Sequence, residues 1–380
     1  MAKKKQNDIP ILGLFIIVLL LLLGPVGWYW QKVGFSDPMW IEANFSQSIY
    51  PMIAQPISKL FGSTRFSFAE FICVTALIWI PLMIVLIFKA CRKRKSVFAS
   101  LAVTFTLILC MISSGYFGYM LLCGLNYARL PYANIAGYDV SPMSVEELTE
   151  LTRSLAEEAN DLRSQLNENA EGVYARNETL ADISLRCKTN YELAGKNAPW
   201  LLGDYSAPKL VFLSEPWAYT KTTGMYFPFT VEANINQVNS DFLYASTMAH
   251  EAAHQRGFMR EDEANFIAYY VCMHSNSIDD RYSGTMLALI HAGNALYAAD
   301  NDAYMQVRST FSQGVIRDLT AHNALWDKYD GKAAEVQDKV NDTYLKSNAQ
   351  EDGVRSYGRM VDLLAGHMRY QKQQNQSGAQ

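Results

Sequence analysis

Apolar residues are concentrated at the start of the chain, in three long runs separated by polar or charged links. The runs cover about residues 9–30, 68–88 and 97–122. Each reaches the roughly 20 predominantly apolar residues that a helix needs to cross the hydrocarbon core of a bilayer. The pattern therefore predicts a membrane anchor over residues 1–123 with three transmembrane helices, and it makes the lipid bilayer the first expected partner.

Basic residues indicate how this anchor is oriented. Lysines occupy positions 3–5, before the first run, and only Arg and Lys occupy positions 92–95, between the second and third runs. Short links rich in these residues stay in the cytoplasm. We therefore expect a multi-pass protein of the cell membrane with a cytoplasmic N-terminus and an extracytoplasmic C-terminal domain. Bulky Trp28 follows residues 24–27, which is not a small-residue cleavage pattern, so the first run is expected to remain as an anchor.

Residues 31–67, between the first two runs, mix apolar and polar positions in an amphipathic pattern. Apolar side chains such as Trp40, Phe45, Tyr50 and Leu60 recur along this stretch. We favour a loop that lies on the membrane surface. The alternative is a lid or docking surface for the domain that follows.

From residue 124 to about 370 the chain follows the period of amphipathic helices, which predicts one mostly helical domain. Ser144 and Glu147 fit a capping box that opens the first helix. Helices are predicted over about residues 144–171, 179–193, 240–257, 260–270, 284–299 and 321–342. Residues 371–380 are rich in Gln, Ser and Gly, so a disordered tail is expected there.

The strongest β signal lies over residues 208–236. Residues 208–213 are predicted as one strand, 222–225 as a turn and 226–236 as a second extended stretch. Pro228 cannot donate to a ladder, so this second strand is expected at the edge of a small sheet, where a peptide could be added as one more strand. Asn234 and Asn236 share a face and are candidates for substrate binding or for capping the next turn. A purely structural edge strand is the alternative.

Composition narrows the range of functions. A net charge of −4 is not the basic footprint of a nucleic-acid-binding protein, so no nucleic-acid partner is expected. The six cysteines show no C-x-x-C spacing, which argues against a zinc ribbon or a thioredoxin-like motif. Cys187 and Cys272 lie in the polar part of the chain and are expected either to pair or to act as small buried hydrophobic residues.

The candidate chemistry lies in the H-E-x-x-H motif His250-Glu251-Ala252-Ala253-His254. Residues four apart lie on one face of a helix, so both imidazoles can reach one Zn²⁺ ion. Glu251 would then activate a zinc-bound water as general base. Ser240 and Asp241 are expected to cap this helix, and Gly257 to end it.

A catalytic zinc site usually has three protein ligands and one open position. The acidic helix that follows Gly257 offers Glu261 and Glu263 as the third ligand. We favour Glu261, because Asn265 lies four residues later and would orient a ligand from the outer shell. If the helix is rotated by half a turn, Glu263 takes this place.

A polar stretch over residues 342–358 contains many turn-forming residues, and such loops often reach a functional site. Tyr357 in this stretch is a candidate catalytic residue that would stabilise the oxyanion of a tetrahedral intermediate.

Together, these stretches resemble a family of bacterial membrane proteins known as domain of unknown function 3810. The resemblance is carried by the three apolar runs, the stretch 224–236, the motif 250–258 with its acidic continuation 261–266, and the stretch 352–357. It implies a zincin-like domain. The acidic continuation also resembles the helix of glutamate-type zinc peptidases that supplies the third ligand, with Asn265 at the position of an aspartate.

The sequence therefore predicts an α+β, mostly helical protein. Three N-terminal transmembrane helices would precede a zincin-like extracytoplasmic domain, over residues 124–370, with a small β-sheet. The expected function is that of a membrane-anchored zinc metallopeptidase acting on a peptide or protein substrate outside the cytoplasm. The alternatives are a non-enzymatic metal-binding sensor or assembly factor of the envelope, and a zinc hydrolase of a non-peptide envelope substrate. The pattern does not determine the oligomeric state.

Overall fold

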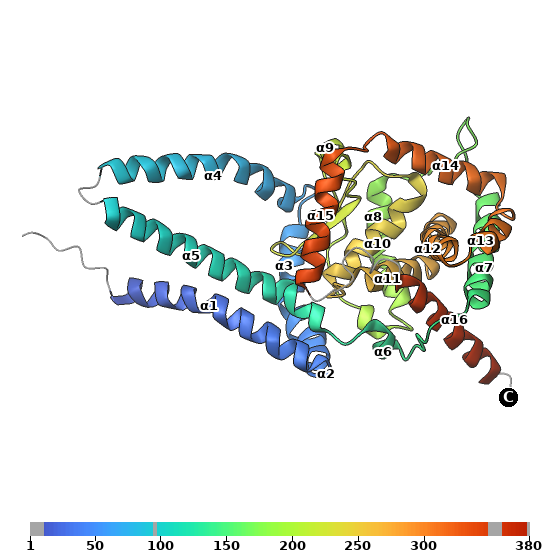
Figure 1. Ribbon diagram of the computed structural model, residues 1–380, viewed down its shortest axis with the longest axis horizontal. Helices are drawn as coiled ribbons and strands as arrows, with labels where there is room; N and C mark the ends of the chain where they lie inside the picture. The colour runs from blue at the N-terminus through green and yellow to red at the C-terminus, as the bar shows by residue number, and fades with distance from the viewer. Residues whose placement is uncertain (1–10, 94–96, 349–358, 378–380) are drawn as a thin grey trace, which may run out of the picture.

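The computed structural model describes residues 11–93, 97–348 and 359–377, and it consists of three long helices that extend from one side of a mostly helical domain (Figure 1). The long helices are α1 (Ile11–Ser36), α4 (Phe68–Lys93) and α5 (Val97–Leu122). All three are long and apolar enough to cross a membrane, which confirms the three predicted apolar helices. α1 packs along α5, whereas α4 stands apart from this pair over most of its length (Figure 1).

The segment between α1 and α4 is helical, so the favoured prediction of a loop is wrong, and it packs in part on the domain that follows α5. It forms α2 (Pro38–Trp40), the π-helix η1 (Ile41–Ile49) and α3 (Tyr50–Gly62). One buried cluster joins this segment to the end of α5 and to the sheet, and it includes Ile41, Phe45, Tyr50, Met120, Leu122 and Val231. Part of the apolar surface of the segment is therefore buried against protein, whereas Trp40, Met52 and Leu60 remain exposed.

A buried ion pair fixes the same segment to the domain. The Arg129 guanidinium lies 2.7 Å from a carboxylate oxygen of Glu42, and both side chains are almost fully buried. Arg129 also donates from Nη1 to the backbone carbonyl of Arg256, at 3.0 Å. One guanidinium thus joins η1 to the chain that leaves the H-E-x-x-H helix.

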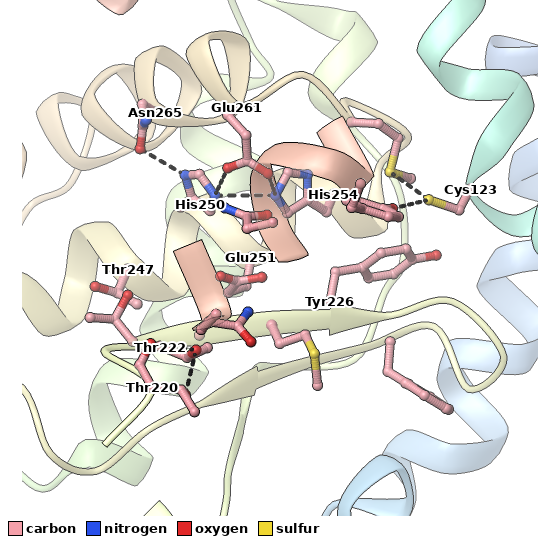
Figure 2. Close-up of a pocket in the computed structure, with 18 of the residues that line it drawn as sticks. Cys123, Thr220, Thr222, Tyr226, Thr247, His250, Glu251, His254, Glu261 and Asn265 are labelled. Atoms are coloured by element: carbon pink, nitrogen blue, oxygen red, sulfur yellow. Dashed lines mark hydrogen bonds and ion pairs between the residues drawn. The ribbon is translucent and has the colours of Figure 1, made fainter. Parts of the chain in front are cut away.

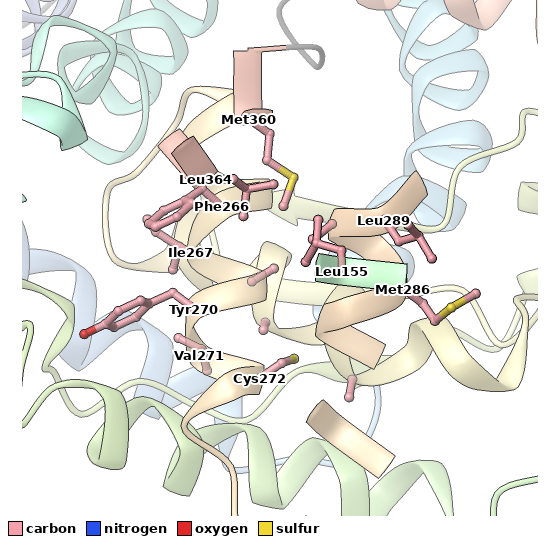
Figure 3. Close-up of a cluster of buried hydrophobic side chains, with 14 of the residues drawn as sticks. Leu155, Phe266, Ile267, Tyr270, Val271, Cys272, Met286, Leu289, Met360 and Leu364 are labelled. Atoms are coloured by element: carbon pink, nitrogen blue, oxygen red, sulfur yellow. The ribbon is translucent and has the colours of Figure 1, made fainter. Parts of the chain in front are cut away.

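The domain after α5 is built from helices and short helical turns around one large core. They are η2 (Gly124–Ala128), α6 (Tyr132–Ala136), α7 (Val145–Ser164), α8 (Leu180–Ala194), η3 (Pro199–Leu201), α9 (Ser214–Ala218), η4 (Asp241–Leu243), α10 (Tyr244–Gln255), α11 (Glu261–Met273), α12 (Ile278–Ala299), α13 (Asn301–Arg308), α14 (Gln313–Asp327), α15 (Lys332–Ser347) and α16 (Met360–Ser377). Figure 3 shows side chains from α7, α11, α12 and α16 meeting in this core. Cys187 and Cys272 are both free and buried there, so they pack as small hydrophobic residues.

The helix starts follow the sequence more closely than the helix ends. Ser144 and Glu147 form the predicted capping box, but α7 ends at Ser164 and not near Gly172. The single helix predicted over 321–342 is divided between α14 and α15. α16 continues through residues 371–377, which contradicts a disordered tail beginning at residue 371. Gln and Lys propagate a helix well once its buried first turns have formed.

The small sheet also differs from the prediction. It contains β1 (Lys209–Leu210), β2 (Gly224–Phe227) and β3 (Glu232–Ile235) in the order β1-β3-β2, with β3 parallel to β1 and antiparallel to β2. The predicted turn at 222–225 and the continuous strand after it are wrong. Pro228 instead begins the turn of a β2–β3 hairpin, where it needs no ladder donor. β2 is consequently an edge strand and β3 is central.

We predict that Arg129→Met lowers the free energy of unfolding by about 3–5 kcal/mol, because it leaves the carboxylate of Glu42 buried without its partner. Thermal unfolding of the purified chain in detergent measures the effect. Arg153→Met, at an exposed position of α7, is the matched control and should change little. Equal stability of the two variants would contradict the role given to the buried pair.

Candidate metal centre

Helix α10 carries the H-E-x-x-H motif and ends in a tight glycine turn. Gly257 has φ of +81°, and the N–H groups of Gly257 and Phe258 donate to the carbonyls of His254 and Ala253 at 3.0 and 3.1 Å. These two bonds form a Schellman motif, which requires the left-handed residue predicted at this position. Ser240 does not cap α10 directly, because the 3₁₀ turn η4 precedes the helix and the Ser240 hydroxyl bonds His322.

The turn after Gly257 returns the chain so that the first residue of α11 faces the two histidines. Glu261 Oε2 lies 3.2 Å from His250 Nε2, and Glu261 Oε1 lies 3.7 Å from His254 Nε2. The two Nε2 atoms are 3.1 Å apart. One ligand atom from each of these residues falls within 4.8 Å of the others, and Figure 2 shows the three side chains pointing toward one another. We call His250, His254 and Glu261 the donor cluster.

A hydrogen bond at Nδ1 of each imidazole ring determines which nitrogen of the ring carries the proton. His254 Nδ1 lies 2.7 Å from the carbonyl of Phe258, which can only accept, so Nδ1 carries the proton. His250 Nδ1 lies 2.9 Å from Asn265 Oδ1, and this amide oxygen also accepts. In the neutral rings both Nε2 lone pairs therefore converge beside a carboxylate, and second-shell bonds of this kind orient metal-binding histidines.

The two candidate glutamates have different surroundings. Glu261 belongs to the donor cluster, whereas buried Glu263 accepts from the backbone N–H of Tyr132 and from Arg260, both at 2.8 Å. The structure thus brings Glu261, and not the alternative Glu263, to the histidines. Asn265 lies where the sequence predicts an orienting partner.

Glu251 lies between the donor cluster and strand β2 (Figure 2). A Cβ at Gly224 would lie 2.5 Å from Glu251 Oε1, so a glycine is needed for the strand to approach this closely. Within the described part of the chain Glu251 Oε2 has no hydrogen-bond partner. Burial raises the pKa of Glu251 to about 8, as suits a proton-transfer group near neutral pH.

The two histidines hold protons differently. Burial lowers the pKa of His250, but its hydrogen bond to Glu261, together with the negative charges of Glu261 and Glu251, outweighs this effect and raises the pKa to about 9. Burial lowers the pKa of His254 to about 4. At neutral pH His250 therefore holds an additional proton, on Nε2 beside the Glu261 carboxylate, whereas the His254 ring stays neutral.

The donor cluster and Glu251 line a cavity of about 750 Å³. Its other walls come from β2 and the loop before it, from the end of α5 and from α15. Tyr344 of α15 joins the end of α5 through its hydroxyl, which lies 3.2 Å from that of Tyr119 and 3.3 Å from that of Tyr127. A volume of this size matches that of small-molecule and peptide sites.

The other predicted site residues lie elsewhere. Asn234 and Asn236 are fully buried in and after β3, outside the cavity lining, so they are not positioned for substrate binding. Asn234 accepts from Ser67 at 2.6 Å. Asn236 accepts from the N–H of Val238 at 2.8 Å, which is the turn-capping alternative. Tyr357 lies outside the described residues.

Several cavity residues were missed by sequence analysis. Gly224 and Tyr226 lie beside Glu251 and His254, and Cys123 and Tyr119 bring the end of α5 into the wall. A glycine at the start of a strand signals a close backbone approach, so Gly224 was accessible to sequence reasoning. The role of Tyr226 depends on the hairpin, which the strand pattern did not predict.

We predict that Glu261→Gln lowers the affinity for Zn²⁺ by more than about 100-fold, beyond the range for loss of an outer-shell partner, because it removes the charged oxygen donor. Glu263→Gln, the matched control, should lower it by less than about tenfold, since Glu263 binds Tyr132 and Arg260. Competition with a chromophoric chelator measures both values. A larger loss for Glu263→Gln would reverse the assignment.

We also predict that binding of Zn²⁺ at pH 7 releases at least one proton, because the metal must displace the proton held by His250. The affinity should rise by at least about tenfold per pH unit up to about pH 8, because both His250 and the Glu251 carboxyl lose protons when the metal binds. It should flatten above about pH 9, where both groups are already deprotonated. Calorimetry in buffers of different ionisation enthalpy measures the proton release. An affinity constant between pH 6 and 8 would contradict this description of the donor cluster.

Comparison with known proteins gives one match. A family model described as "Protein of unknown function (DUF3810)" matches residues 45–365, from within η1 to within α16. A search of curated proteins and a search of solved structures each gave no match. The matched residues include α4, α5, the sheet and the donor cluster. The chain therefore belongs to the DUF3810 family, as its sequence resemblance predicted.

Proposed function

We propose that this chain is a membrane-anchored zinc metallopeptidase that hydrolyses peptide bonds outside the cytoplasm, with an outer domain of the zincin type. The observation that carries the proposal is the donor cluster itself. Two imidazoles with fixed Nδ1–H groups and one carboxylate converge within 4.8 Å on one wall of the cavity. Glu251, the motif's general base, lies beside them.

The donor set fits zinc better than a harder cation. Two imidazole nitrogens and one carboxylate match the ligand types of catalytic zinc sites, which keep a fourth position open, whereas Ca²⁺ and Mg²⁺ prefer all-oxygen sites. His250, His254 and Glu261 would hold the ion, with Asn265 and the Phe258 carbonyl orienting the rings. Zinc at this position supplies a Lewis acid that polarises the scissile carbonyl and makes water more acidic.

Glu251 carries the proton transfer in this proposal. Its buried carboxyl has a raised pKa of about 8 in the metal-free protein, and positive charge in the donor cluster would lower that pKa and favour the carboxylate. The carboxylate then accepts a proton from the attacking water and returns it to the leaving amine. The nearby backbone N–H of Tyr226 also lowers the pKa of Glu251 and so favours its carboxylate form.

The edge of β2 supports a peptide as the substrate. The N–H of Asn236 donates to the carbonyl of Thr223. Because hydrogen-bonded pairs alternate in an antiparallel ladder, the main-chain N–H and C=O groups of Met225 and Phe227 also point toward β3. The main-chain groups of Gly224 and Tyr226 therefore lie on the other side of β2. An extended peptide can add to such an edge.

The open cavity favours a catalytic zinc site over the main alternative, a zinc site with a structural or sensing role. A structural or sensing zinc site is typically closed by four protein ligands. In the described residues the group that could hold a metal contains three, and it opens on a cavity of about 750 Å³. This arrangement favours hydrolysis over a purely structural metal, and the β2 edge favours a peptide over a non-peptide substrate.

We predict that Glu251→Gln keeps about one zinc per chain but lowers hydrolysis of an unfolded, fluorescently quenched test protein by about 10²–10⁴-fold, because it removes the proton acceptor. Metal content by mass spectrometry and the hydrolysis rate of the full chain are the two measurements. Glu171→Gln, at an exposed position, is the control. A fully active Glu251→Gln variant, or a zinc-free wild-type protein, would refute the proposed function.

A further inference from the structure

The end of the third long helix forms part of the cavity wall. Tyr119, in the last turn of α5, and Cys123, directly after it, both line the cavity. α5 has 26 residues, about 39 Å at 1.5 Å per residue, against a hydrocarbon core of about 30 Å. If α5 crosses the bilayer, its last turn lies in the interface, where Tyr is enriched. The cavity then begins at the bilayer surface.

The hairpin turn between β2 and β3 lies between the outer ends of α4 and α5. The Glu232 carboxylate accepts from the backbone N–H groups of Phe68 and Ala69, at 3.2 and 2.8 Å, and so caps the start of α4. A Cβ at Gly118 of α5 would lie only 3.4 Å from the ring of Phe229. One end of β2 is therefore at the membrane side of the domain, and its other end is at Gly224, beside Glu251.

A single side chain bridges the remaining interval between the donor cluster and the third long helix. The Tyr226 hydroxyl donates to the carbonyl of Leu122, the last residue of α5, at 2.9 Å. The centroid of the same ring lies 6.3 Å from that of the His254 ring. An extended chain advances about 3.3 Å per residue, so only a few residues separate this site from the bilayer surface.

The membrane end of the cavity is also apolar. Met225, Phe227, Pro228 and Phe229 line it, and Phe229 remains 45% exposed. An exposed aromatic residue beside the end of a membrane-spanning helix suits a chain that passes from lipid into water.

We infer that the cavity takes an extended segment of another membrane-tethered protein, within a few residues of its anchor. This inference rests on the proposed peptidase function for the cleavage step and on the three long helices crossing the bilayer. The segment pairs with the free edge of β2, with its anchored end near Phe227 and its outward part passing Gly224 and Glu251. A peptide free in solution lacks the anchor that fixes this register.

Photo-crosslinking in nanodiscs tests the register. The full chain carries Glu251→Gln, to prevent cleavage, and p-benzoylphenylalanine in place of either Phe227 or Thr222, which both line the cavity. The probe is a single-span peptide with a 30-residue polar arm (about 100 Å when extended), compared with the same arm lacking the span. Phe212 is the control position, because it is 88% exposed next to the start of α4 and lies outside the cavity lining.

The expected result is capture at position 227 of arm residues adjacent to the span, and capture at position 222 of residues about five positions farther out. The free arm should be captured at least tenfold less at both positions. At position 212 no particular region of the arm should be captured in preference to another. Equal, scattered capture of free and anchored arms, or no capture of the anchored arm, would overturn the inference. The test requires no hydrolysis, so its two failures can be told apart. If the wild-type protein hydrolyses peptides but the register is not observed, only this inference is contradicted. If the register is observed but the wild-type protein is inactive, only the proposed hydrolysis is contradicted.

Discussion

Two hydrogen bonds on the outer sides of two imidazole rings determine what the centre of this protein can do. The Phe258 carbonyl and the Asn265 amide oxygen hold the Nδ1–H groups of His254 and His250, so both Nε2 lone pairs face each other and a carboxylate. Three acceptors this close repel one another when buried, unless a proton or a cation lies between them. The arrangement therefore favours a positive charge at one point.

The positions of these groups depend on how α10 ends. The Gly257 turn reverses the chain and presents both the Phe258 carbonyl and Glu261 to the rings. The carbonyls at the end of α10 accept hydrogen bonds from the side of the molecule that carries the long helices. The Tyr50 hydroxyl donates to Gln255 at 2.9 Å, and Arg129 donates to Arg256 at 3.0 Å. The helical segment that follows α1 thus supports the end of α10 directly through Tyr50, and indirectly through the ion pair between Glu42 and Arg129.

Sequence reasoning succeeded where the pattern is local. The i, i+4 spacing of His250 and His254 and the same spacing of Glu261 and Asn265 led to the residues that the structure brings together. Prediction from the sequence failed where the surface that packs against a helix or strand comes from a distant part of the chain. The amphipathic pattern of residues 31–67 does not distinguish lipid from a protein surface, and η1 and α3 pack on protein. Pro228 was assigned to a strand because the hairpin turn that accommodates it is only evident from pairing, and this error also placed Asn234 and Asn236 in a substrate site.

X-ray absorption at the zinc edge of the purified, full-length protein tests the central claim most directly. The expected spectrum shows one zinc per chain with two imidazole nitrogens at about 2.0–2.1 Å and the remaining ligands all oxygen. The same spectrum from a protein with His254→Ala should show one imidazole fewer. Absence of zinc, a sulfur ligand, or a histidine signal unchanged by His254→Ala would contradict the account.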